Sequence, residues 1–302
     1  MSRPGRRPSC AVEATLEKSE RGLSPSVVER YPASSEKYQT SKRHVLGWEL
    51  PGHGSSYHDC GSWRHEGCLN VEEHRQEGIL ESMAGKVYVR HYKRSCARAD
   101  CPICYEKWAG KEASKIEIRL LSWWSSRKVI HVIASPKNIH ARTMAEKRRE
   151  LYSVLRKAGV IGGSVIFHPY REIKGTKSWY WSPHFHVLGY GWIHHTRELY
   201  AKTGWVVKNA GLRKSISGTA LYQLSHCGVH EKLHAVTWFG ALAYNKLRVK
   251  IPKPEKETCP ICGEVLRPLW YFGANKLPAV EGYYWVDPEG WEYKPVRRWS
   301  GG

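Results

Sequence analysis

The sequence predicts an α+β protein in which helices pack on a mostly antiparallel sheet. Three observations support this class: short β-branched or aromatic runs that end at Pro or Gly, segments with helical periodicity, and an irregular order of the two. A doubly wound parallel sheet would need regular strand–helix alternation, so the irregular order favours helices on an antiparallel sheet. With 302 residues, the chain is long enough for one large domain or two modest ones.

Each expected element has its own local signal. The run from Lys128 to Ala134 is β-branched and ends at Ser135-Pro136, as a buried strand does, and Thr143 to Ala158 has helical periodicity between a candidate N-cap and Gly159. The remaining expectations are helices over 105–124 and 217–227 and strands over 163–170, 184–189 and 234–242, with a loop around Gly175. Roughly the last forty residues are aromatic and turn-rich, and give no clear assignment.

The chain divides by composition into four parts. Residues 1–44 are polar and charged and predict a disordered arm. The other parts are a small zinc-ribbon-like cysteine module over 45–110, a main α+β domain over 111–250, and a C-terminal extension with a CxxC pair over 251–302.

The charge indicates a polyanionic partner. Formal net charge is +20, with 14 Trp and 17 Tyr, and cations with aromatic faces suit single-stranded nucleic acid, whose bases are free to stack. No apolar run has the length of a membrane span, and the basic N-terminus lacks the apolar stretch of a signal peptide. We therefore expect no membrane partner and an intracellular location, where clustered cysteines favour metal over disulfides.

His184-Phe185-His186 is the first candidate metal site. In a strand, residues two apart point to one face, so the two imidazoles would lie side by side. With 16 histidines in the chain, about one His-x-His is expected by chance, so the pair alone is weak.

A candidate nucleophile follows the histidine pair. In a helix over 217–227, Tyr222 and His226 are four apart and share a face. His226 would be the third metal ligand beside His184 and His186, and the Tyr222 hydroxyl would attack a phosphate that the metal polarises. Tyr244 is the alternative nucleophile. A purely structural role is also open, in which Tyr222 packs in the core while His226 caps the helix.

The cysteines predict structural zinc. Cys101-Pro-Ile-Cys104 is a zinc knuckle, and Cys60 and Cys68 are its expected partners, with Cys96 or His65 competing for a place. Cys259 and Cys262 form a second knuckle, whose partners would be His230 and His234 or the upstream cysteines.

These motifs resemble the HUH endonuclease superfamily. The runs Ile166-Phe-His-Pro169, Ser182-Pro-His-Phe-His-Val187, Leu221-Tyr-Gln-Leu-Ser-His-Cys-Gly228 and Val236-Thr-Trp-Phe-Gly240 are similar to rolling-circle replication initiators of archaeal plasmids and viruses. The resemblance covers roughly residues 60–265. Many relatives carry a lysine three or four residues after the tyrosine, whereas this chain has His226.

The resemblance implies a five-stranded antiparallel sheet with flanking helices over 111–250, with the strand Val129 to Ser135 beside the metal site. It further implies a catalytic Mg²⁺ or Mn²⁺, nicking of single-stranded DNA at a replication origin through a phosphotyrosine, and a prokaryotic cytoplasm. The chain has no Gly-x-x-x-x-Gly-Lys-Ser/Thr run, so host helicase and polymerase are expected partners. Two alternatives stay open: an HUH transposase of an insertion sequence, and a non-catalytic zinc-ribbon DNA-binding protein.

Overall fold

The structure is a computed structural model that describes residues 37–38, 47–137, 144–173, 178–252, 255–274 and 279–295. The predicted arm over 1–44, apart from two residues, the helix cap Thr143 and the loop around Gly175 lie outside these ranges. The chain forms two compact units. We call Met1–His53 with Ala109–Val249 the histidine unit, and Gly54–Trp108 with Lys250–Gly302 the cysteine unit.

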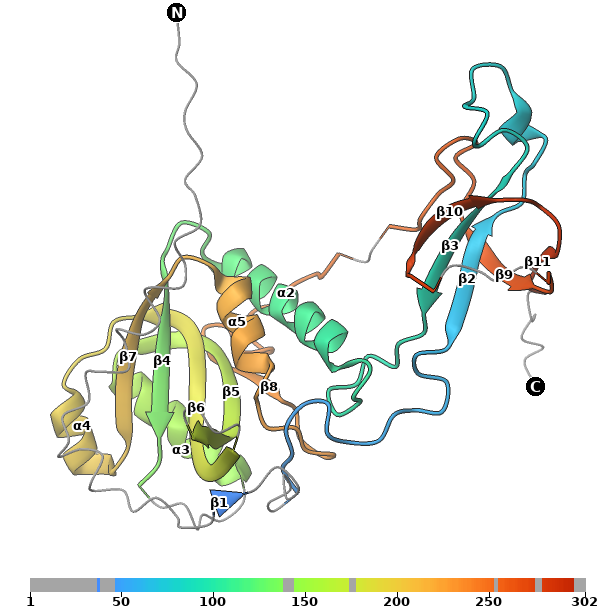
Figure 1. Cartoon of the computed structure of the whole chain (residues 1–302). Helices are drawn as coiled ribbons and strands as arrows, with labels where there is room; N and C mark the ends of the chain where they lie inside the picture. Colours follow the sequence, from blue (N-terminus) through green and yellow to red (C-terminus); the bar gives the residue numbers. More distant parts are fainter. Residues whose placement is uncertain are drawn as a thin grey trace, which may run out of the picture. The chain divides into compact units, whose positions relative to one another are not determined.

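The histidine unit is built on an antiparallel sheet with the strand order β7-β4-β6-β5-β8 (Figure 1). The strands are β4 (Val129–Ser135), β5 (Val160–Ile173), β6 (Ser178–Gly191), β7 (Val206–Arg213) and β8 (Val236–Gly240), and a short β1 (Lys37–Tyr38) pairs with β6. All described pairings in this sheet are antiparallel. The predicted combination of helices with antiparallel sheet is therefore confirmed.

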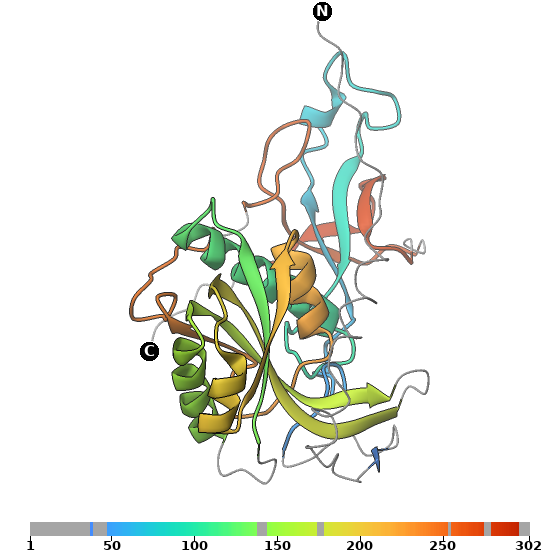
Figure 2. The same cartoon turned by 90° about the vertical axis from the view of Figure 1, so that its left-hand side faces the viewer.

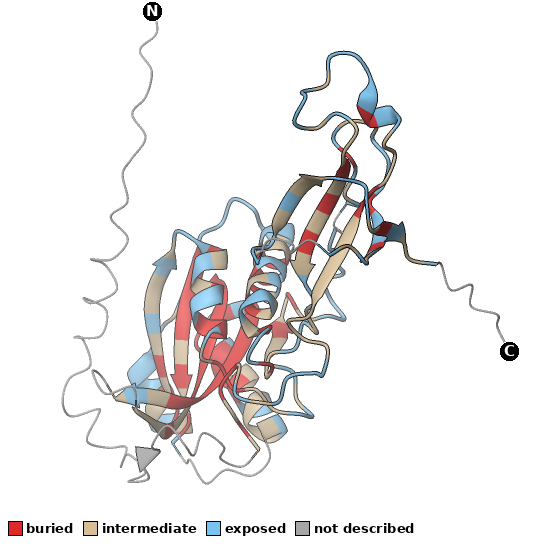
Figure 3. Cartoon of the chain, turned by 45° about the vertical axis from the view of Figure 1, so that its right-hand side comes forward, coloured by how far each residue is buried: buried red, intermediate tan, exposed pale blue. Residues whose placement is uncertain are grey.

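Helices cover both faces of this sheet (Figure 2). On one face, α3 (Met144–Lys157) and α4 (Thr196–Thr203) contribute Leu151, Leu155 and Leu199 to the main apolar core. The opposite face carries α5 (Ile216–Leu224) and the residues of α2 (Tyr105–Trp123) from Ala109 onward. There the Tyr190 hydroxyl of β6 donates to the carbonyl of Leu120 at 2.9 Å. Figure 3 shows the buried residues concentrated in the strands between these helices.

The sequence located most elements of the histidine unit but shortened two of them. The expected helix over 105–124 and strand over 128–134 match α2 and β4 closely. The expected strands over 163–170 and 184–189 are parts of a long hairpin, in which β5 and β6 have 14 residues each and pair from Val160–Gly191 to Ile173–Ser178. The sequence missed α4 and β7. In β7, Lys208, Asn209 and Gly211 interrupt the apolar residues, so the strand shows no regular alternation.

The cysteine unit has its own antiparallel sheet, with the order β10-β3-β2-β9-β11. Its strands are β2 (Trp63–Cys68), β3 (Val87–Lys93), β9 (Arg267–Tyr271), β10 (Gly282–Val286) and β11 (Trp291–Tyr293). Strands from the C-terminal segment lie on both sides of the pair β2–β3, so the segment predicted as an extension shares one sheet with residues 63–93. The core of this sheet is Val87, Val89, Leu269 and Trp291.

Among the residues that the structure describes, no helix combines the length and the apolar character needed to cross a bilayer.

Candidate metal centre and tyrosine site

Three histidines meet on the α5 face of the sheet because of strand register. His184 and His186 lie two apart on β6, and His168 of β5 lies directly opposite His184. Residues that are opposite each other in an antiparallel pair project to the same face. One nitrogen from each of the three imidazoles lies within 4.8 Å of the other two, and all three side chains are buried.

His168, rather than the predicted His226, is the third member of this group among the described residues. The sequence shows that His168 stands in a strand, but the pairing of His168 with His184 follows from the register of the hairpin. That register depends on contacts across two strands, which no local pattern in either strand displays.

Burial keeps the three imidazoles neutral. The pKa values of His168, His184 and His186 all lie well below the ordinary value, chiefly because burial disfavours the charged form. Neutral imidazole offers a nitrogen lone pair to a metal. Both ring nitrogens of His168 are buried without a hydrogen-bond partner, which is costly unless another group satisfies them. The donor set and this orphaned side chain fit a divalent metal.

Backbone and side-chain bonds orient two of the three rings. The Nδ1–H of His184 donates to the Ser182 carbonyl at 2.7 Å, which leaves Nε2 free for a ligand. Nδ1 of His186 lies 2.7 Å from Nε2 of His131 on β4, and Arg213 of β7 donates to Nδ1 of His131 at 2.7 Å. Strand neighbours thus hold His186 in place through His131.

Tyr222 and His226 lie beside this group. The helix α5 starts at the N-cap Ser215, whose hydroxyl accepts the Gly218 N–H at 3.0 Å. The ring centroid of His226 is 4.6 Å from that of Tyr222 and also 4.6 Å from that of His168. Tyr222 is 55% exposed, so its ring is accessible from solvent while it contacts His226. Burial lowers the pKa of His226 to about 4, and this imidazole is therefore neutral at neutral pH.

Tyr244, the alternative nucleophile, has a different environment. Its ring is 65% exposed and lies 4.6 Å from the guanidinium carbon of Arg119, whose N–H groups donate to the carbonyls of Leu242 and Leu247. None of the described ring contacts joins Tyr244 to the three histidines. Of the two tyrosines, Tyr222 is the one placed beside the histidine group.

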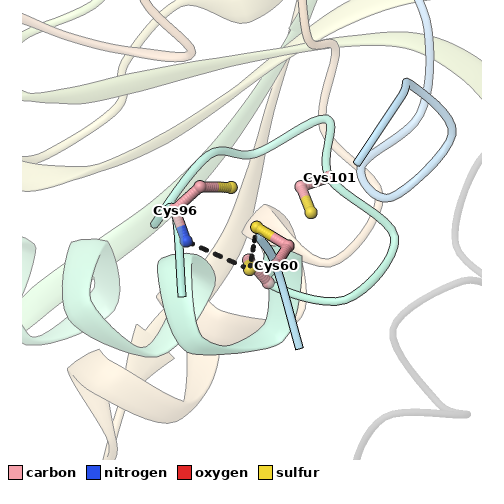
Figure 4. A group of neighbouring side chains, drawn as sticks. Cys60, Cys96 and Cys101 are labelled. Atoms are coloured by element: carbon pink, nitrogen blue, oxygen red, sulfur yellow. Dashed lines mark hydrogen bonds between the residues drawn. The ribbon is translucent and has the colours of Figure 1, made fainter. Parts of the chain in front are cut away.

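Four cysteines of the cysteine unit form a separate group. The thiols of Cys60, Cys96, Cys101 and Cys104 lie within 4.8 Å of one another. Figure 4 shows the side chains of Cys60, Cys96 and Cys101 gathered at this place. Sγ of Cys60 lies 3.5 Å from Sγ of Cys104, which also accepts the backbone N–H of Cys96 at 3.4 Å. Burial raises the pKa of Cys104, but hydrogen bonds from Ser95, Cys96 and the neighbouring thiols outweigh it and lower this pKa to about 6. The group has the ligands of a tetrahedral zinc site.

The structure does not bring Cys60 and Cys68 together as expected. Cys60 precedes the extended strand β2 and Cys68 is its last residue, and a strand rises about 3.3 Å per residue, so the two thiols are too far apart to share one metal. Cys96 takes the place given to Cys68, and His65 is not in the group. Cys68 instead lies with Cys259, Cys262 and His74, so the second knuckle meets an upstream cysteine rather than His230 and His234.

The positive charge is concentrated in the histidine unit. Residues 109–249 contain 23 Lys and Arg against 7 Asp and Glu, whereas residues 54–108 contain 8 of each. An anionic ligand would therefore be attracted mainly to the unit that contains the three histidines and Tyr222.

Comparisons of the chain with protein-family models, with curated proteins and with solved structures found no match. The resemblance to the HUH superfamily therefore stays a prediction, and the function is inferred from the residues and geometry of the site.

Proposed function

We propose that the protein is a metal-dependent enzyme that nicks and rejoins single-stranded DNA through a covalent phosphotyrosine, as a rolling-circle replication initiator does. The observation that carries this proposal is the contact of exposed Tyr222 with His226, which in turn contacts His168 of the three-histidine group. A nucleophile, a neutral base and a metal-binding group are thereby adjacent in one unit.

His168, His184 and His186 would hold the catalytic ion. A bound divalent ion would polarise a phosphate oxygen and stabilise the charge that develops during transfer. Three imidazoles without a carboxylate suit transition metals better than Mg²⁺, so of the two expected ions we favour Mn²⁺. The group of Cys60, Cys96, Cys101 and Cys104 would hold a structural Zn²⁺, because four protein ligands leave no open position for chemistry.

In the proposed step, the Tyr222 hydroxyl attacks phosphorus and its proton passes to neutral His226. The bond from Tyr222 Oη to phosphorus forms, the bond from phosphorus to the 3′ oxygen breaks, and that oxygen takes a proton from water. The product is a 5′-phosphotyrosine and a free 3′ hydroxyl. Rejoining is the reverse reaction, in which a 3′ hydroxyl attacks the phosphotyrosine.

Single-stranded DNA at a replication origin is the proposed substrate. The excess of Lys and Arg over residues 109–249 supports a polyanion, and Trp179 of the β5–β6 hairpin lies 6.2 Å from His226 between ring centroids. An aromatic ring beside the site gives a base a surface for stacking. Host helicase and polymerase would extend the released 3′ end.

The first prediction concerns the covalent adduct. A 3′-labelled pool of single-stranded oligonucleotides, incubated with the protein and Mn²⁺, should transfer its label to the protein on a denaturing gel. Tyr222→Phe should abolish this transfer, since the substitution removes only the attacking oxygen, and Tyr244→Phe serves as the matched control that retains it.

Two outcomes would contradict the proposal. An undiminished adduct with Tyr222→Phe would rule out this nucleophile. If origin strands also gave no adduct with any divalent metal, while DNA binding persisted, the non-catalytic zinc-ribbon alternative would be favoured.

A further inference from the structure

A second group of metal-ligand side chains lies in the cysteine unit, and its histidine has no motif in the sequence to mark it. Cys68, His74, Cys259 and Cys262 place their ligand atoms within 4.8 Å of one another. Sγ of Cys68 lies 3.4 Å from Sγ of Cys262, and Nε2 of His74 lies 3.2 Å from Sγ of Cys259 and 3.7 Å from Sγ of Cys68.

These separations match a tetrahedron around zinc. With bonds of about 2.3 Å to sulfur and about 2.0 Å to nitrogen, the edges of such a tetrahedron are about 3.8 Å between sulfurs and about 3.5 Å between sulfur and nitrogen. Ordinary buried thiols have no reason to gather at these separations around a single imidazole.

The imidazole is held with one nitrogen toward the thiols. His74 is fully buried in the short 3₁₀ helix Glu73–Arg75, and its Nδ1–H donates to the Lys86 carbonyl at 2.7 Å. The proton is therefore on Nδ1, and Nε2 presents its lone pair to Cys68 and Cys259. A backbone carbonyl that fixes the tautomer in this way is the usual outer partner of a metal-bound histidine.

The cysteine pair has the backbone of a zinc knuckle. The N–H of Gly263 donates to the Cys259 carbonyl at 3.0 Å, and Gly263 has a φ of +74°, which a side chain would disfavour. The N–H of Cys259 also bonds the Glu264 carbonyl at 2.8 Å, closing a tight turn ahead of β9. Cys259 and Cys262 are thereby turned toward the same point.

We propose that Cys68, His74, Cys259 and Cys262 bind a second structural Zn²⁺, which fastens the C-terminal segment to the strand pair β2–β3. Four protein ligands close the coordination shell, so the site has no catalytic position. The metal connects Cys68 to a residue 194 positions later in the chain. Such a long-range link removes much conformational freedom from the unfolded chain. This proposal does not depend on the nuclease chemistry.

The test measures zinc bound per chain in the full-length protein. Zinc is counted by mass spectrometry after gel filtration, in wild type, His74→Ala and His74→Cys. We expect His74→Ala to lose one zinc per chain and His74→Cys to retain it, because a fourth thiolate restores the ligand set. Cys227→Ser is the matched control, since Cys227 is a buried cysteine outside both groups and its replacement should leave the count unchanged.

A second readout keeps the proposal testable when a variant folds poorly. When wild type and variants are loaded with Co²⁺, Cys259→Ser should lower the sulfur-to-cobalt absorption by about the contribution of one site relative to wild type, while Cys227→Ser should not change it. Unchanged zinc content in soluble His74→Ala, or unchanged cobalt absorption in Cys259→Ser, would overturn the second site.

The outcome is separable from that of the proposed function. Tyr222→Phe should lose the DNA adduct and keep its full zinc content. His74→Ala should lose zinc while the three-histidine group, which lies in the other unit, keeps its affinity for Mn²⁺.

Discussion

The imidazoles of His226 and His168 lie next to each other, but we expect His226 to act as a base and His168 to act as a metal ligand. His168 is fully buried within the three-histidine group, whereas His226 is half-buried and contacts both His168 and Tyr222. A metal ligand and a general base can be distinguished by whether their removal changes metal affinity or reaction rate. The loss of a ligand weakens metal binding, while the loss of a base slows the reaction of a fully metal-loaded enzyme.

The second prediction separates these two roles. His226→Ala should slow adduct formation by roughly a hundredfold or more, the usual contribution of general base catalysis, and leave Mn²⁺ affinity within about twofold of wild type. His168→Ala should weaken Mn²⁺ binding itself. Single-turnover adduct kinetics and calorimetric Mn²⁺ titration measure the two effects. A large loss of Mn²⁺ affinity in His226→Ala would restore it as a ligand.

Arg213 sets the direction of the hydrogen-bond chain that ends on His186. A guanidinium only donates, so Nδ1 of His131 accepts, and neutral His131 carries its proton on Nε2, which faces Nδ1 of His186. Burial and the nearby Arg213 charge lower the pKa of His131 to about 3, which keeps it neutral. A metal bound at Nε2 of His186 would require the protons of both His186 and His131 to move to Nδ1, and His131 would then lose the hydrogen bond from Arg213.

The β5–β6 hairpin is the element that assembles the three-histidine group. Gly189 pairs with Gly163 across its two strands, and a Cβ on Gly189 would overlap the Gly162 carbonyl oxygen and lie 3.0 Å from Cα of Gly163. Backbone rather than a flexible side chain occupies that space, so a larger residue would have to push the strands apart. The pairing of His168 with His184 lies further along the same two strands.

The third prediction uses this close approach. Gly189→Ala should lower the melting temperature and weaken Mn²⁺ binding, although no ligand is changed. Gly110→Ala in α2 is the matched control, because apart from its chain neighbours and the backbone of its own helix no atom lies within 4 Å of the new methyl group, and alanine favours a helix by about 0.5–1 kcal/mol. Thermal melts and Mn²⁺ titrations of both variants check it. Unchanged metal affinity in Gly189→Ala would show that the hairpin does not set the ligand geometry.

The elements also show how far the sequence alone could lead. The sequence predicts that His184 and His186 share a face of a strand and that Tyr222 and His226 share a face of a helix. Both predictions rest on the residue spacing of a single element, which is a local property. The sequence does not mark His168 and His74 as candidate ligands, since the first depends on strand register and the second on a contact with Cys259, 185 positions away. The antiparallel class followed from the order of elements, whereas the shared sheet of residues 63–93 and 267–293 depends on pairing across the whole chain.

At the scale of the whole molecule, buried neutral histidines make stability depend on pH. Burial lowers the folded-state pKa of His131 to about 3 and of His226 to about 4, and those of the three candidate ligands also fall. In the unfolded chain these groups have a pKa of about 6.5. Between the folded and unfolded values, the unfolded state binds more protons, so acid favours unfolding.

The fourth prediction follows from this direction of the change of stability with pH. The metal-free protein should be most stable above about pH 6.5 and should lose stability steadily as the pH falls from there toward 4. Urea unfolding monitored by tryptophan fluorescence at several pH values measures the change. Mn²⁺ should raise stability at pH 7.5 more than at pH 5.5, because protons compete with the metal for the imidazoles. Stability that is constant from pH 7.5 to pH 4.5 would contradict the buried neutral assignment.

The distribution of charge gives the fifth prediction. Because the excess of Lys and Arg is in residues 109–249, single-stranded DNA affinity should fall steeply with salt, with a logarithmic slope of about −0.7 for each phosphate neutralised. Charge reversal of exposed Lys111 and Lys214 in the histidine unit should reduce that slope, whereas reversal of exposed Arg75 and Lys93 in the cysteine unit should not. Fluorescence anisotropy over a salt series distinguishes the cases, and a flat salt response would count against a nucleic-acid ligand.

Because the sheet of the cysteine unit combines strands from both ends of the chain, it cannot be completed until late in translation. Strands β2 and β3 are synthesised long before β9, and at about 5–20 residues per second the delay from Lys93 to Arg267 is roughly 10–35 seconds. The four-cysteine group is complete once Cys104 has emerged, and the histidine unit can fold next. The group of Cys68 and His74 must wait, with its two first ligands exposed, for the last pair to arrive. Zinc supply during translation therefore matters most for the site that is finished last.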